Sequence, residues 1–197
     1  MCKEVRIDRV LKVKAYACPL WVAKPEVTIL EDKEQAQMVI KDYKPGQVDL
    51  YMDASVCKGR AGIGVYAMPS QACISKVVAS SNQADTHVIE LIAISEAANW
   101  PWGPSCIAFN REGLPVPASS IQIFSDSQLA LMSIWSWKAG ACQEIVAEII
   151  KKLQISNVIL YWILEHSGIE RNEEADKLAK AAMKEENEEL PQQDGTL

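Results

Sequence analysis

Three successive strand-like runs in the first half of the chain constrain its fold most strongly. They span residues 47–55, 60–68 and 72–80, and short breaks containing Gly or Pro separate them. The first run, QVDLYMDAS, alternates apolar with polar side chains, which is typical of a strand with two different faces. Runs spaced so closely predict an antiparallel meander.

The second half of the chain alternates helices with strands. Helix patterns cover 86–100, 127–138, 142–154 and 172–186, and strand patterns cover 120–126 and 157–164. Before the meander we expect a short strand at 26–30 and a helix at 31–43, and a surface loop is expected at 102–118. The order predicts an α/β fold in which one mixed sheet carries helices on its faces, and it excludes a helical bundle, a sandwich and a TIM barrel.

Length and composition suit one domain with appendages. The chain has 197 residues and a net charge of −6. We expect residues 46–184 to form the domain, 1–45 to be an extension or linker with a short helix, and 185–197 to be a flexible acidic tail. The acidic total disfavours a nonspecific polyanion binder, but it leaves room for an enzyme that meets phosphate groups through metal ions.

Localisation is predicted from what the chain lacks. No apolar run is long enough to span a membrane, and the first residues show no secretion signal. The cysteines form no CxxC pair, so we expect free thiols and no zinc site. Together these features predict an intracellular protein, cytoplasmic or nuclear.

Four acidic residues stand where acids are awkward. Asp53 lies within a strand, and Asp126 ends a strand just before a helix, at the sheet edge where ligands bind in α/β proteins. Glu90 shares its helix face with small and apolar residues, and Asp176 lies beside core positions of the last helix. With almost no Lys or Arg nearby, the set indicates a hard divalent cation, magnesium or manganese.

Each acid alone has a simpler interpretation. Asp126 fits a helix N-cap, Asp53 a surface acid near a turn, Asp176 a solvated helix residue, and Glu90 a partner for a lysine. His166 follows a buried strand and precedes Asp176 by ten residues, although a loop histidine is often a solvent-exposed bystander. The motifs of dinucleotide-binding proteins, P-loop enzymes, serine hydrolases and zinc peptidases are missing.

Four strings in the chain resemble a known family. VDLYMDAS, THVIELIAISEA, IQIFSDSQLAL and LYWILEHSGIERNEEADKLAKAA occur in the order of the type 1 ribonuclease H family. The last string is the most specific, because a histidine precedes by ten residues an aspartate within N-E-x-A-D-x-L-A. More narrowly, residues 18–184 resemble ribonuclease H domains of fungal non-LTR retrotransposon polyproteins.

The resemblance implies a fold and an activity. The fold is a five-stranded mixed sheet whose first three strands are antiparallel, flanked by helices. The activity is cleavage of the RNA strand of RNA–DNA hybrids, leaving 5′-phosphate ends, with two Mg²⁺ ions for which Mn²⁺ can substitute. A reverse transcriptase domain of a parent polyprotein is the implied protein partner.

The resemblance also assigns residues. The metal-binding acids are Asp53, Glu90, Asp126 and Asp176, and His166 assists product release or proton transfer. Contacts to the 2′-hydroxyl groups of the RNA are expected near Ala54, Ser55, Thr86 and Ser127.

Several motifs depart from the family pattern. The usual Asp-Gly-Ser is Asp53-Ala54-Ser55, the usual Trp-x-Pro-Gly-His ends as Leu164-Glu165-His166, and the usual Gly-Asn-Glu is Arg171-Asn172-Glu173. These departures leave two alternatives open. One is a catalytically weakened module that binds nucleic acid or protein as a scaffold, and the other is a related nuclease with a different nucleic-acid substrate.

Overall fold

The computed structural model describes residues 24–79, 85–100, 107–110, 112–136, 142–154, 158–165 and 167–184. The helices are α1 (Lys33–Lys41), α2 (Thr86–Ala98), α3 (Gln128–Ser136), α4 (Gln143–Leu153) and α5 (Glu170–Ala182). The strands are β1 (Glu26–Ile29), β2 (Gln47–Cys57), β3 (Arg60–Met68), β4 (Cys73–Ala79), β5 (Ile107–Phe109), β6 (Pro115–Pro117), β7 (Ser120–Ser125) and β8 (Val158–Trp162). The expected extension 1–45 is thus described only from residue 24, and the expected tail 185–197 lies outside the described residues.

One mixed sheet organises the fold, as the sequence predicts. Its strand order is β1-β8-β7-β2-β3-β4. The meander β2-β3-β4 is antiparallel, whereas β7 pairs parallel with β2 and with β8. The sheet has six strands and not the expected five, because β1 pairs in parallel with the outer edge of β8. That pairing covers backbone groups that an edge strand would leave open.

A small hairpin interrupts the segment 102–118, so the expectation of a plain surface loop was wrong there. Strands β5 and β6 pair antiparallel. The side chain of Asn110 closes the turn by accepting hydrogen bonds from the backbone N–H groups of Glu112 and Leu114, at 3.0 and 2.9 Å. Gly113 takes the positive φ of +75° that this turn requires.

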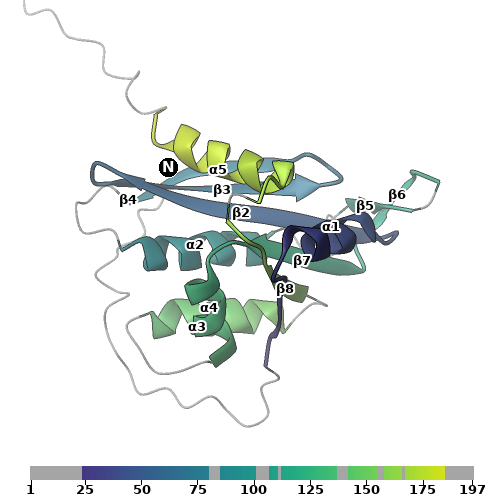
Figure 1. The fold of residues 1–197 in the computed structure, drawn as a ribbon, viewed down its shortest axis with the longest axis horizontal. Helices are drawn as coiled ribbons and strands as arrows, with labels where there is room; N and C mark the ends of the chain where they lie inside the picture. The colour runs from purple at the N-terminus through teal and green to yellow at the C-terminus, as the bar shows by residue number, and fades with distance from the viewer. Residues whose placement is uncertain are drawn as a thin grey trace, which may run out of the picture.

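Helices cover both faces of the sheet (Figure 1). Helix α2 lies against one face with α3 and α4 beyond it, and α5 lies against the opposite face over β3. The first face buries a large aliphatic core that includes Leu50, Met52, Ile63 and Ile123. The other face carries an aromatic stack of Tyr51, Phe124 and Tyr161, with ring centroids 4.7 and 5.1 Å apart, which α1 and α5 help to cover.

Two glycines of β3 allow α5 to approach the sheet closely. A Cβ at Gly62 would overlap the carbonyl oxygen of Ala179, and one at Gly64 would overlap that of Ala175. The hydroxyl of Ser75 on β4 also donates a hydrogen bond to the carbonyl of Leu178, at 2.9 Å. The small residues of β3 therefore determine how near the acid-bearing face of α5 lies to β2.

None of the described helices is both long enough and apolar enough to cross a membrane.

Candidate active site

Asp53 and Asp126 meet because their strands are parallel neighbours. Tyr51 of β2 pairs with Phe124 of β7, so two residues further along, Asp53 and Asp126 reach the same edge of the sheet. Asp53 is 8% exposed, and Asp126 follows the end of β7. Asp53 thus lies within its strand and Asp126 just after the end of its own, as the sequence predicts, and the parallel pairing brings them together.

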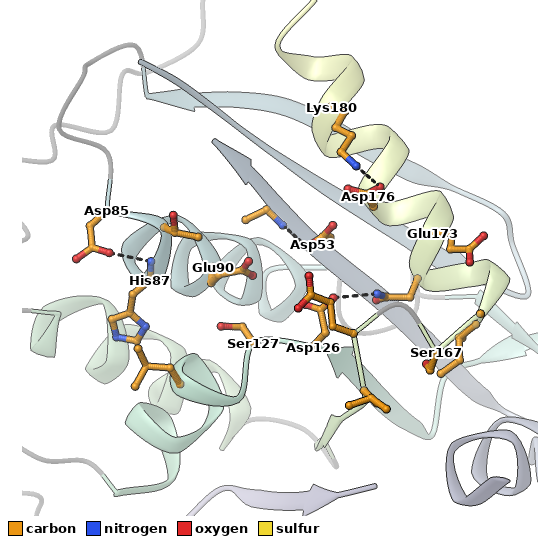
Figure 2. Close-up of a pocket in the computed structure, with 18 residues that line it drawn as sticks. Asp53, Asp85, His87, Glu90, Asp126, Ser127, Ser167, Glu173, Asp176 and Lys180 are labelled. Carbon is orange, nitrogen blue, oxygen red and sulfur yellow. Dashed lines mark hydrogen bonds and ion pairs between the residues drawn. The ribbon is translucent and has the colours of Figure 1, made fainter. Parts of the chain in front are cut away.

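Glu90 completes a group of three carboxylates. It projects from α2 toward Asp53 and Asp126, as Figure 2 shows, and it is 8% exposed. One oxygen from each of the three residues lies within 4.8 Å of the others. Three elements far apart in the sequence thus bring three acids to one point.

Burial and mutual repulsion make these acids hard to ionise. Burial, and then the charge of Asp126, raises the pKa of Asp53 to about 7, although the N–H of Ala54 donates to its carboxylate at 2.8 Å. Burial, and then the charges of Asp53 and Asp126, raises the pKa of Glu90 to about 9. The buried Oε2 of Glu90 has no hydrogen-bond partner. A cation between the acids would relieve both costs.

Asp176 reaches the same pocket from α5, but it has a cationic neighbour. The ammonium group of Lys180 donates to Oδ2 of Asp176 at 2.6 Å. A hydrogen bond with Asp176 also contributes to the raised pKa of Asp53, so the fourth predicted acid adjoins Asp53. It is not one of the three residues whose oxygens lie within 4.8 Å of one another.

Asn172 and Lys180 are site residues that sequence reasoning did not select. The side-chain amide of Asn172 donates to Oδ2 of Asp126 at 3.3 Å, and Lys180 binds Asp176. Both lie four residues from Asp176 on α5. Residues at that spacing share one face of a helix, so the sequence could have indicated that they lie beside Asp176. The contact of Asn172 with Asp126 joins two distant elements, so spacing along the chain could not reveal it.

The acids open into a pocket of about 640 Å³. Of the expected substrate-contacting residues, Ala54, Thr86 and Ser127 line it, and Ser55 is not among the described lining residues. His87 also lines it and places Nε2 3.4 Å from the hydroxyl of Ser133. His166 lies outside the described residues. The carboxylates of the described lining are Asp53, Asp85, Glu90, Asp126, Glu165, Glu173 and Asp176.

The donor set fits a hard divalent cation. The clustered ligands are carboxylate oxygens, which suit magnesium or manganese, and no described His or Cys joins the cluster. The unpartnered Oε2 of Glu90 is a buried acceptor that a cation would satisfy.

Comparison with known families agrees with the fold. The RNase H family model matches residues 45–184, so the chain belongs to the RNase H family. This family usually uses divalent metal ions and acts on RNA–DNA hybrids, and the acid cluster lies within the matched residues. A search of curated proteins finds no match.

Proposed function

We propose that the protein is an endonuclease that hydrolyses the RNA strand of RNA–DNA hybrids and leaves 5′-phosphate ends. The observation that carries this proposal is the convergence of Asp53, Glu90 and Asp126 from three separate elements, with oxygens within 4.8 Å. We also propose a retroelement origin and a reverse transcriptase domain as partner, supported by the motif order over residues 18–184.

Asp53, Glu90 and Asp126 would hold the ions, with Asp176 at the edge of the group. Two Mg²⁺ ions, when bound, would supply a more acidic attacking water and compensate charge on the leaving 3′ oxygen. Other groups of the protein would hold these carboxylates in position. The amide of Asn172 fixes one oxygen of Asp126, the N–H of Ala54 fixes one oxygen of Asp53, and burial keeps Glu90 aimed at both.

The hybrid would lie across the mouth of the pocket, with the scissile phosphate near the acids. Thr86 and Ser127 offer hydroxyl groups on the pocket wall, and the 2′-hydroxyl is the group that distinguishes RNA from DNA. We propose that His166 adds proton transfer or product release, in line with its place ten residues before Asp176.

Cleavage of an end-labelled hybrid in Mg²⁺ tests the proposal. Asp126→Asn should reduce the rate by at least about 100-fold while leaving the circular dichroism spectrum unchanged, because it removes a charged ion ligand. Asp42→Asn, an equivalent change at an exposed acid beyond α1, should cleave as the wild type does. Equal cleavage by Asp126→Asn would reject the assigned centre.

One observation supports the scaffold alternative. Lys180 already occupies an oxygen of Asp176, as a cation would. Tight binding of a hybrid by the wild type, without cleavage in either Mg²⁺ or Mn²⁺, would favour a binding module. Parallel assays on duplex DNA and duplex RNA identify a nuclease with a different substrate.

A further inference from the structure

A second acid of β2 is buried away from the carboxylate cluster. Asp49 is fully buried and projects from the same face of β2 as Asp53, four residues earlier. Its Oδ1 accepts a hydrogen bond from the side-chain amide of Gln47 at 2.6 Å, whereas its Oδ2 has no hydrogen bond. Burial raises the pKa of Asp49 to about 6. An anion at this position needs a nearby cation.

Arg171, in the first turn of α5, supplies that cation. Its Nη1 lies 3.8 Å from Oδ2 of Asp49 and donates to the hydroxyl of Tyr51 at 3.3 Å. The guanidinium also lies 5.8 Å from the centre of the Tyr51 ring. Tyr51 is fully buried and stacks on Phe124, so Arg171 contacts a buried, well-packed part of the sheet.

The start of α5 is otherwise held by the buried side chain of Ile169, which packs with the aromatic stack, and by the amide of Asn172. No side chain caps the helix at Ile169. The residue after Arg171 is Asn172, whose amide holds Asp126, and Asp176 follows one turn later. A shift of this first turn would therefore move both groups relative to the carboxylates of β2 and β7. The motif that this chain resembles has a glycine in place of Arg171, which cannot make such contacts.

We infer that Arg171 is a positioning residue, which seats the first turn of α5 on Asp49 and Tyr51 so that Asn172 and Asp176 face the acid cluster. For catalysis the inference rests on the proposed function. For ion binding it rests on the geometry of the site alone.

Arg171→Gln tests this role through Mn²⁺ binding, measured by calorimetry, and through cleavage kinetics on the hybrid. We expect about tenfold weaker ion binding, the size typical of losing a group that orients metal ligands. The kcat should fall by a similar factor while KM for the hybrid changes little, because Arg171 does not line the pocket. Lys177→Gln, on the exposed side of α5, is the matched control and should bind Mn²⁺ as the wild type does.

The double variant Asp49→Asn/Arg171→Gln distinguishes two roles of Arg171: positioning α5 and neutralising the charge of Asp49. Removing the unpaired carboxylate of Asp49 should restore the thermal unfolding temperature toward that of the wild type, but it should leave ion binding weak. If Arg171→Gln does not fold, the double variant carries the test. Wild-type ion affinity in folded Arg171→Gln, or its full recovery in the double variant, would overturn the inference.

The two proposals fail in different ways. A wild type that binds Mn²⁺ but leaves the hybrid intact would refute the nuclease proposal, and the ion affinities would still decide the role of Arg171.

Discussion

At the scale of residues, the pocket holds acids in opposite environments. Glu90 is buried and has an oxygen without a hydrogen-bond partner, whereas Asp176 is partly exposed and pairs with Lys180. The contact with Glu90 should therefore contribute most to the free energy of ion binding. At Asp176 an ion must compete with the ammonium group of Lys180. Two substitutions probe this difference.

Glu90→Gln should raise the stability of the fold and lower the cleavage rate. The folded protein raises the pKa of Glu90 to about 9 from the ordinary 4.5. Between these values the folded protein keeps a proton that the unfolded chain releases, so the contribution of Glu90 to stability falls as the pH rises. We expect the variant, without metal, to melt at a higher temperature than the wild type, with a larger gain at about pH 8 than at about pH 5. Cleavage should fall by about 100-fold or more. Glu112→Gln, in the turn of the hairpin, is the control, and a lower melting temperature at both pH values would contradict the prediction.

Lys180→Gln should strengthen ion binding. The Lys180 ammonium pairs with Asp176, and a half-exposed pair of this kind contributes roughly 0.2–1 kcal/mol, equivalent to a gain of up to about fivefold in affinity. Calorimetry with Mn²⁺ measures the change against Lys177→Gln. Weaker binding by Lys180→Gln would instead mean that the lysine helps to hold Asp176 in place.

At the scale of elements, the contact between α5 and β3 aligns the site. Gly62 and Gly64 let the helix backbone lie against the strand, and no larger residue fits at either position without a shift. Helix α5 carries Asn172 and Asp176. A change in the distance between α5 and the sheet would therefore move both side chains relative to the carboxylate cluster.

Gly64→Ala should therefore harm both the fold and the site. Overpacking of this kind costs about 1–3 kcal/mol in the free energy of unfolding, and displacement of α5 should weaken Mn²⁺ binding as well. Gly113→Ala offers a contrast, because its positive φ makes alanine strained in an open turn far from α5. That variant should lose stability in denaturant titrations but keep its ion affinity. Unchanged ion affinity in Gly64→Ala would show that the close approach does not align the site.

Most elements could be predicted because their signals are local. The strand at 60–68 has the expected bounds, and the helix expected at 86–100 begins at Thr86 as predicted. The place of Asp126 at the carboxyl end of its strand, at the sheet edge where ligands bind, also followed from sequence, whereas the parallel pairing that brings Asp53 beside it did not. The assignment of residues 46–184 as one domain stays a prediction.

The rest depends on partners that are distant in the chain. The run at 26–30 is too short for its sequence to show which strand it pairs with. It becomes the sixth strand because it pairs with the open edge of β8. The hairpin of β5 and β6 escaped notice because its prolines suggested a loop, although they fit a short edge pair. Likewise, the contact of Asn172 with Asp126 and the ion pair of Arg171 with Asp49 join residues that no periodicity connects.

At the scale of the whole molecule, negative charge dominates. The chain carries a net charge of −6, and acids crowd the described pocket lining. Such a pocket repels a polyanion until cations enter it, so ion binding and substrate binding should be coupled.

Burial of the acids makes the stability of the fold depend on pH and metal. The folded state raises the pKa of Asp49 to about 6, that of Asp53 to about 7 and that of Glu90 to about 9, so it holds more protons than the unfolded state. Through these groups, stability is highest in mild acid and falls as the pH rises from about 4 to about 9. Millimolar Mg²⁺ should raise the melting temperature more at about pH 9 than at about pH 5, as scanning calorimetry would show. An equal shift at both pH values would mean that the ions bind elsewhere.

The order in which the acids occur along the chain has a consequence during synthesis. Asp53, Glu90 and Asp126 leave the ribosome before α5, which brings Asn172, Asp176 and the grip of Arg171. A nascent chain that stops before residue 170 has every strand of the sheet but lacks the helix that aligns the proposed centre. Synthesis of α5 would thus complete the acid-lined pocket, and we expect a chain that stops earlier to bind Mn²⁺ weakly.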